Sequence, residues 1–307
     1  MASNPKLDRL LGRMSDLEHQ SVDKDLEALL YGPPGTGKTT LAMGLAQKLA
    51  AGRDIIYVDS ADGWVSLEDF PGLLANTHRV AFEEYSDLMG LSGQLALPPA
   101  KRVKAFQQLD VAVIVLDELS SMADTVLDTV LRERLGTKDE DIPDVVPEWS
   151  DYFPQKELIR KAVLAFHGID GLHVISTAHA KEKVDHRKVK VTRPDFPDKL
   201  LGELQKIMHV TGFVSSETGM KSGEVQYTRR IQIQPTALIE AKTRIRGLPY
   251  RMELPTFVRG VDEWINSGQI AADLAADEDT TLAEDELPTD GLPVSDDNSD
   301  DEGVEVE

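Results

Sequence analysis

The chain has 307 residues, of which 41% are hydrophobic and 28% charged, a composition typical of a soluble globular protein with a sizeable core. It has no cysteine, which excludes disulfides, thiolate zinc sites and cysteine nucleophiles. The longest aliphatic run, residues 111–116, is far shorter than the roughly 20 residues of a membrane-spanning helix, and the N-terminal segment lacks the apolar stretch of a secretory signal. These features predict a soluble, cytoplasmic protein with no membrane partner.

The net charge of −21 comes from 33 basic and 54 acidic residues, and it is unevenly distributed. Residues 271–307 hold 15 Asp or Glu and no Lys or Arg, so the rest of the chain has 39 acidic and 33 basic residues, a net charge of −6. The composition of residues 269–307 predicts a disordered acidic tail. Because the imbalance lies mostly in this tail, the acidic pI does not exclude nucleic acid as a partner of the folded part.

In chain order, apolar residues at helical spacing predict an N-terminal helical segment over residues 1–24. Near-continuous aliphatic runs then predict buried strands, and amphipathic stretches between them predict helices. Strands that alternate with helices indicate an α/β fold with a mostly parallel sheet. The expected strands are 26–31, 54–59, 111–117, 172–177 and 207–214, and the expected helices are 39–49, 122–131 and 158–166.

The pattern changes after residue 214. Residues 215–223 are typical of a turn-rich loop, residues 225–234 alternate as an antiparallel strand does, and residues 237–241 predict one more strand. These segments predict an antiparallel extension at one edge of the sheet, followed by a helix over 258–267. We expect a single domain over residues 25–268.

The strongest motif matches G-x-x-x-x-G-K-[ST] and lies between a predicted strand and a predicted helix. Its glycines allow the backbone to curl so that N–H groups point at phosphate oxygens, and the start of the helix adds a favourable field for an anion. Lys38 is expected to reach the β- and γ-phosphates, and the Thr39 hydroxyl to bind Mg²⁺. The residues predicted to contact the nucleotide are Gly32, Pro33, Pro34, Gly35, Thr36, Gly37, Lys38, Thr39 and Thr40.

A second motif, VAVIVLDE, ends a predicted buried strand with two carboxylates. Asp117 can hold Mg²⁺ through water, and Glu118 can polarise the attacking water. Two alternatives stay open. Glu118 can instead face the dipole of the helix that it precedes. Asp59 or Asp62, which follow the second strand, can lie at the same ligand-binding edge of the sheet.

The string GPPGTGKTTLA together with Asp-Glu resembles an AAA+ ATPase, whereas the rest of the chain resembles the small phage-encoded RecA-like ATPases that act as single-strand annealing proteins. The second resemblance covers roughly residues 25–255. It rests on four further stretches, YVDSADGWVSL, HVISTAHAKEKVD, PDFPDKLLGELQKIMHVTGFV and IEAKTRIRGLP. It implies a RecA-like P-loop core, ATP as the nucleotide, and a homo-oligomer with the nucleotide at the subunit interface.

This resemblance also implies roles for individual residues. His179 would sense the γ-phosphate and relay its state to the loop that follows, and Lys242 and Arg244 would neutralise transition-state charge in the adjacent subunit. The alternatives are a strand-end histidine without a role and an exposed strand end with solvated charges. At Ala61 the sequence departs from the family, which tends to have a catalytic glutamate there, so the role of catalytic base falls to Glu118 or Asp62.

Residues 181–199 hold seven basic and four acidic residues and two prolines, which predicts a positively charged, mobile loop. Such a loop suits the backbone of single-stranded DNA, with a salt-sensitive affinity, while only Phe196 offers a stacking platform. The alternative is a solvated charged loop. The candidate DNA-binding residues are Lys181, Lys183, Arg187, Lys188, Lys190 and Arg193.

Together these features predict an ATP-hydrolysing RecA-like protein that binds single-stranded DNA and promotes annealing or strand exchange in phage recombination or replication. The acidic tail is either a solubilising extension, a competitor of DNA for the basic loop, or a docking site for a basic partner such as a cognate single-strand-binding protein. Two other classes stay open. An AAA+ protein remodeller or helicase loader would need a helical lid after the core, and a non-hydrolysing scaffold would bind nucleotide structurally.

Overall fold

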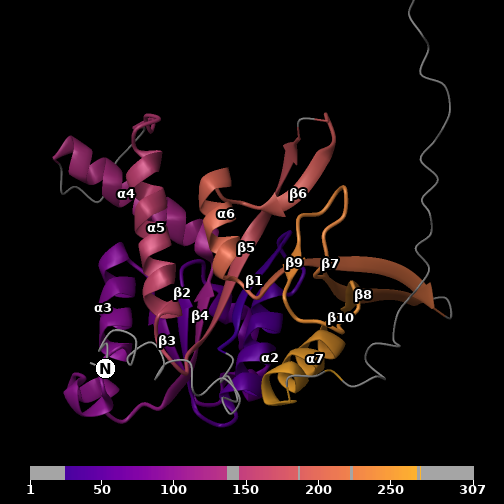
Figure 1. The fold of residues 1–307 in the computed structure, drawn as a ribbon, viewed down its shortest axis with the longest axis horizontal. Helices are drawn as coiled ribbons and strands as arrows, with labels where there is room; N and C mark the ends of the chain where they lie inside the picture. Colours follow the sequence, from indigo (N-terminus) through magenta and orange to yellow (C-terminus); the bar gives the residue numbers. More distant parts are fainter. Residues whose placement is uncertain (1–24, 137–144, 186, 222–223, 268–269, 271–307) are drawn as a thin grey trace, which may run out of the picture.

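The structure is a computed structural model that describes residues 25–136, 145–185, 187–221, 224–267 and 270 (Figure 1). The predicted N-terminal helical segment therefore lies outside the described residues, as does the predicted acidic tail apart from Ile270. Of the helices in the described ranges, none is both long and apolar enough to cross a membrane.

A ten-stranded sheet runs through the structure in the order β10-β8-β7-β1-β5-β4-β2-β3, with β6 paired to β5 and β9 paired to β7. All neighbours from β7 to β3 are parallel, and β6, β8, β9 and β10 join the sheet antiparallel. The strands are β1 (Glu27–Gly32), β2 (Asp54–Asp59), β3 (Thr77–Ala81), β4 (Val111–Asp117), β5 (His173–Val184), β6 (Lys190–Pro194), β7 (Val210–Lys221), β8 (Glu224–Gln232), β9 (Lys242–Thr243) and β10 (Arg251–Glu253).

Helices cover both faces of the sheet, so the central parallel strands are buried on both sides, whereas the parallel edge strand β3 is mostly exposed. In β1, Ala28 and Leu30 pack with α2 and α7, whereas Leu29 and Tyr31 pack with α3 to α6 on the opposite face. The helices are α2 (Lys38–Ala50), α3 (Tyr85–Leu95), α4 (Leu119–Leu135), α5 (Tyr152–His167), α6 (Asp198–Ile207) and α7 (Leu254–Ser267), with short 3₁₀ helices η1 (Gly63–Leu67), η2 (Pro71–Leu74), η3 (Pro99–Lys101) and η4 (Lys104–Phe106).

This architecture confirms the predicted fold, a RecA-like P-loop core with a mostly parallel sheet and an antiparallel extension at one edge. The five aliphatic runs all became strands, and the three helical patterns became α2, α4 and α5. Among the described residues after β7 there are three strands and the single helix α7, so the helical lid that the AAA+ alternative requires is not formed there.

Three local expectations were wrong. The basic segment after His179 is not a mobile loop, because β5 continues to Val184 and pairs with β6 as a hairpin (Figure 1). The carboxylate of Asp185 organises the turn by accepting the backbone N–H groups of Arg187 and Val189.

The second and third errors concern the antiparallel extension. Residues 215–221 are the second half of β7 rather than a loop, since they pair with β8 over their whole length. Residues 237–241 form only an isolated bridge at Ile239, and the segment that pairs with the sheet is β9. Cross-strand pairing, rather than local composition, decided both cases.

The register of the parallel strands brings their carboxyl ends to one edge. Gly32 lies opposite His179, and Asp59 lies opposite both Asp117 and Ala81. In an open α/β sheet this edge is where ligands bind. The nucleotide motif, the paired carboxylates and the sensor candidate therefore meet at one place.

Candidate active site

The phosphate-binding loop joins the end of β1 to the start of α2, as predicted. Gly35 and Gly37 have φ angles of 75° and 92°, a region that only glycine adopts without strain. No side chain caps the start of α2, so the N–H groups of its first turn, which includes Thr39 and Thr40, face the loop without a side-chain partner. Curled backbone and helix start together form a cradle for phosphate.

Lys38 lies inside this loop and is buried. Its Nζ donates hydrogen bonds to the carbonyl oxygens of Gly32 and Pro33, at 3.0 and 3.2 Å. Burial lowers the pKa of the ammonium, while Glu118 and Asp117 oppose that shift. The Thr36 hydroxyl donates to the Pro33 carbonyl at 2.9 Å and holds the loop's shape. The lysine is therefore already directed along the loop where the phosphates are expected.

Asp117 ends β4 and accepts hydrogen bonds from three hydroxyl groups. Thr39 Oγ1 and the Tyr57 hydroxyl donate to Oδ2, at 2.9 and 2.5 Å, and Thr177 donates to Oδ1. Burial and the neighbouring Asp117 raise the pKa of Tyr57, so its phenol stays a donor. A threonine hydroxyl beside a carboxylate is the hard oxygen donor set that Mg²⁺ takes, so these residues fit the predicted ion.

Glu118 is buried at the start of α4 and contacts His179 on β5. Their Oε2 and Nε2 atoms are 2.7 Å apart, and Ser121 Oγ also donates to Oε2 at 3.2 Å. The Glu118 side chain makes no capping bond to α4, although the helix-dipole alternative expects one. Its other oxygen, Oε1, is buried without a hydrogen-bond partner among the described residues.

Burial raises the pKa of the Glu118 carboxyl, and His179 is the strongest of the groups that oppose this shift. A carboxylate whose pKa is raised toward neutral pH is a more effective general base than an ordinary one. The arrangement therefore provides one oxygen held by His179 and Ser121 and another available to a water molecule.

The two rival carboxylates lie elsewhere on this edge. Asp59 is buried and accepts bonds from Arg79, at 2.7 Å, and from the backbone N–H of Gly63, at 2.9 Å. Its oxygens thus hold the turn between β2 and η1. The Asp62 side chain is 89% exposed and lies 3.4 Å from Arg79. Of the three candidate bases, only Glu118 combines burial with an oxygen that has no partner in the described chain.

Lys242 and Arg244 lie far from the chain's own phosphate-binding loop. Strand β9 pairs with Val210 and Thr211 at the start of β7, level with the beginning of β1 rather than with its end at Gly32. Lys242 Nζ and an Arg244 guanidinium nitrogen donate to the carbonyls of Gln205 and Lys206 in the last turn of α6. Within one subunit these two cations therefore stabilise a helix end.

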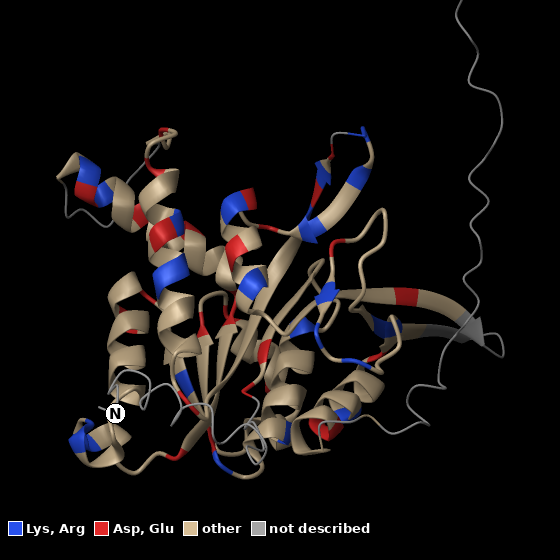
Figure 2. Ribbon diagram, in the orientation of Figure 1, with Lys and Arg blue, Asp and Glu red and all other residues tan. Residues whose placement is uncertain are grey.

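The β5–β6 hairpin carries both charges, as Figure 2 shows. Five of its six candidate DNA-binding residues pair with carboxylates, and Lys188 has no such partner among the described residues. The pairs are Lys181–Asp195, Lys183–Asp198, Arg187–Asp185, Lys190–Glu182, Arg193–Asp198 and Arg193–Glu240.

Sequence reasoning missed Tyr57, Thr177 and Ser60. Ser60 Oγ accepts the backbone N–H of Glu118 at 2.9 Å, and the other two donate to Asp117. A usable signal existed for two of them. Tyr57 precedes Asp59 by two residues and Thr177 precedes His179 by two, so each shares a strand face with a candidate site residue.

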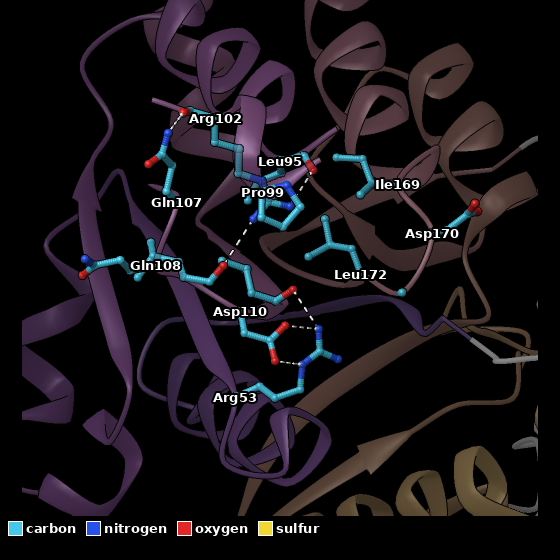
Figure 3. A pocket seen from close by; sticks show the side chains of 13 residues that line it. Arg53, Leu95, Pro99, Arg102, Gln107, Gln108, Asp110, Ile169, Asp170 and Leu172 are labelled. Atoms are coloured by element: carbon cyan, nitrogen blue, oxygen red, sulfur yellow. Dashed lines mark hydrogen bonds and ion pairs between the residues drawn. The ribbon is translucent and has the colours of Figure 1, made fainter. Parts of the chain in front are cut away.

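A cavity of about 370 Å³ lies at the opposite edge of the sheet, near the amino end of β4 (Figure 3). Both of its arginines are already engaged. Arg53 pairs with Asp110 through two hydrogen bonds of 3.1 and 3.0 Å, and Arg102 donates to three backbone carbonyls, those of Leu95, Leu97 and Leu109. This cavity is therefore separate from the nucleotide site.

Solved structures similar to this chain include three from different functional classes. They are the flagellar accessory protein FlaH from Methanocaldococcus jannaschii (13% identity, 71% of this chain and 83% of that chain, TM-score 0.35), the RadB recombinase (16%, 74% and 84%, 0.38) and a DnaB-like replicative helicase (12%, 75% and 64%, 0.37). No curated protein matches the sequence.

A family model described as an AAA domain matches residues 24–245. The matched range contains the phosphate-binding loop, Asp117, Glu118 and His179, that is, the whole nucleotide site described above. Because the match covers well over half of the chain, the chain belongs to the AAA domain family and is a P-loop ATPase.

Proposed function

We propose that this ATPase binds single-stranded DNA along the β5–β6 hairpin and promotes annealing or strand exchange in phage recombination or replication. The observation that carries the proposal is the continuity of β5, which runs from His179, beside Glu118, directly into the basic hairpin. Because the two regions share one strand, we expect a displacement of the His179 backbone at the nucleotide site to displace the hairpin backbone as well.

The binding of ATP and the activation of the attacking water are assigned to residues of one subunit. Lys38 and the loop N–H groups bind the phosphates of ATP, and Thr39 with Asp117 holds Mg²⁺, which when bound neutralises phosphate charge. Glu118 Oε1 accepts a proton from the attacking water, while His179 holds Oε2 in place. The charge of Glu118 and the position of His179 are thereby coupled.

The DNA contact is assigned to the six basic residues of the hairpin. Because five of them pair with carboxylates, phosphates must displace those carboxylates in order to bind. We therefore expect a moderate affinity that falls steeply with salt and has little dependence on base sequence. The hairpin tip, with Lys188, is the first point of contact.

We place the interface between subunits at the nucleotide site. Lys242 and Arg244 are too far along the sheet to reach the phosphates of their own subunit, so any contact with nucleotide has to come from a second copy. An added cation at the γ-phosphate accelerates hydrolysis by several orders of magnitude in ATPases that use an arginine finger. The acidic tail and its three predicted roles, including recruitment of a single-strand-binding protein, lie outside the described residues.

The deciding experiment measures ATP hydrolysis with and without single-stranded DNA at two salt concentrations. We expect single strands to stimulate the wild-type rate and the stimulation to weaken at the higher salt. Lys38→Ala should remove hydrolysis in every condition. The triple variant Lys183→Ala/Lys188→Ala/Lys190→Ala should lose most of the stimulation and bind single strands with a smaller salt slope.

A matched control is Lys101→Ala/Lys104→Ala, which removes exposed lysines around η3 and η4 at the opposite edge of the sheet. It should keep the full stimulation. If wild-type hydrolysis is indifferent to DNA, or if both lysine variants behave alike, the DNA proposal fails while the ATPase assignment stands.

A further inference from the structure

Strand β8 carries an arginine across the phosphate-binding loop of its own subunit. A Cβ atom placed on Gly37 would lie 3.1 Å from both Cδ and Nη1 of Arg229 and 3.3 Å from its Cζ. The stem and the guanidinium therefore both run over the backbone of Gly37. A side chain at position 37 would meet Arg229, quite apart from the positive φ that the residue requires.

The antiparallel extension that carries Arg229 packs closely against the phosphate-binding loop. A Cβ on Gly32, where β1 ends, would collide with the carbonyl oxygen of Val214 on β7. Val214 pairs with Ile231 on β8, two residues beyond Arg229, and both side chains are fully buried. Arg229 thus approaches Gly37 from a packed part of the sheet.

The positive groups around Gly37 favour a bound anion. The start of α2 carries the positive end of the helix dipole, and Lys38 adds a full charge there. The Arg229 side chain is exposed and has no ion pair or hydrogen bond among the described residues, whereas its neighbour Arg230 pairs with Glu217. A third positive group beside two others is unfavourable unless a negative ligand lies between them.

We propose that Arg229 binds the phosphates of the nucleotide held by the same subunit, as a second cation beside Lys38. The guanidinium suits this role because its planar fork can donate two parallel hydrogen bonds to phosphate oxygens. The residue is a nucleotide-binding residue delivered by the antiparallel extension, which thereby completes the site on the side opposite Asp117 and Glu118. It acts within one subunit, unlike the role proposed for Lys242 and Arg244.

The test is the dissociation constant for ATP and for ADP, measured on Arg229→Ala, Arg229→Lys and Arg230→Ala. We expect Arg229→Ala to weaken ATP binding roughly tenfold to hundredfold, the range for losing a hydrogen bond to a charged group. Arg229→Lys should recover part of this loss, since the charge remains but the fork does not. A loss confined to ATP locates the contact at the γ-phosphate, and an equal loss for ADP locates it nearer the β-phosphate.

Arg230→Ala is the matched control, because it removes the same charge from the next position of the same strand. It should bind ATP as the wild type does. Thermal melting of all three variants checks that β8 is intact. Wild-type affinity in Arg229→Ala, or equal losses in Arg229→Ala and Arg230→Ala with unchanged melting, would overturn the proposal.

Discussion

Two consecutive carboxylates, Asp117 and Glu118, have opposite surroundings. Asp117 receives three hydroxyl hydrogen bonds, from Thr39, Tyr57 and Thr177. Glu118 has one oxygen held by His179 and one buried oxygen without a partner in the described chain. A carboxylate beside the Thr39 hydroxyl suits a metal ion, whereas a carboxylate with a desolvated free oxygen suits proton transfer.

At this scale we predict that Glu118→Gln lowers the rate of ATP hydrolysis by about 10²–10⁴-fold, the usual worth of a general base, while ATP still binds. Asp62→Asn should hydrolyse ATP at close to the wild-type rate, because the Asp62 side chain is 89% exposed and, in the part of the chain that the structure describes, forms an ion pair with Arg79 alone. Steady-state kinetics and equilibrium binding on both variants check this. A larger loss of hydrolysis rate in Asp62→Asn than in Glu118→Gln would identify Asp62 as the general base instead.

At the scale of elements, the start of β1 is held by histidines from its two neighbours. His173 Nδ1 on β5 accepts the backbone N–H of Leu26 at 2.9 Å, and His209 Nδ1 before β7 accepts that of Glu27 at 3.1 Å. Both bonds need an unprotonated nitrogen. Burial, with nearby cations, lowers the pKa of each histidine to about 4.

These histidines predict a loss of stability in acid. Between about pH 6.5 and pH 4 the unfolded chain binds protons that the folded histidines exclude, so the free energy of unfolding should fall as the pH falls through that window. His173→Asn/His209→Asn keeps an acceptor oxygen but cannot be protonated. Urea unfolding at a series of pH values should therefore show a flatter dependence in this variant.

Glu27 changes the free energy of unfolding with pH in the opposite sense to the histidines. Its contribution therefore has to be separated from theirs in the urea experiment. Burial, with Asp25, raises its pKa to about 8, and His167 Nδ1 lies 2.6 Å from its Oε1. Its contribution is present at low pH and is lost as the pH rises from about 4.5 through 8. Glu27→Gln should remove that loss, so the histidine variant is compared in the Glu27→Gln background, where the slope between about pH 4 and 6.5 comes from the histidines. Equal slopes with and without the histidine substitutions in that background would contradict the assignment.

At the scale of the whole molecule, the nucleotide edge of the sheet and the segment with Lys242 and Arg244 lie at different levels along the strands. If these cations act on a neighbouring subunit, two inactive variants that lack different parts of the site can form an active site when they are mixed. Lys38→Ala lacks a working loop but keeps both cations. Lys242→Ala/Arg244→Ala keeps the loop but lacks the cations.

We predict that each variant alone hydrolyses ATP poorly and that mixing the two restores part of the rate, because a mixed interface contains one complete site. Titration of one variant into the other at fixed total protein checks this. Melting temperatures are needed alongside, since both cations also bond the end of α6. A stable double variant with full activity, or a mixture no more active than its parts, would rule out the contribution in trans.

Much of this protein follows from its sequence alone. The phosphate-binding loop could be located because its function resides in eight consecutive residues, and a local motif needs no tertiary context to be recognised. Five of the parallel strands could be located because a strand buried on both faces is apolar at almost every position, whereas β3, which is mostly exposed, was missed. Asp117 and Glu118 followed from their place at the end of such a strand.

Tertiary structure alone decided which of these residues meet. The contact of Glu118 with His179, the hydroxyls on Asp117 and the approach of Arg229 to Gly37 all join segments that are distant along the chain. Their partners depend on strand order and register, which local composition does not encode. The basic segment shows the same limit, since its charges suggested a mobile loop while cross-strand pairing made it a hairpin with most of those charges already paired.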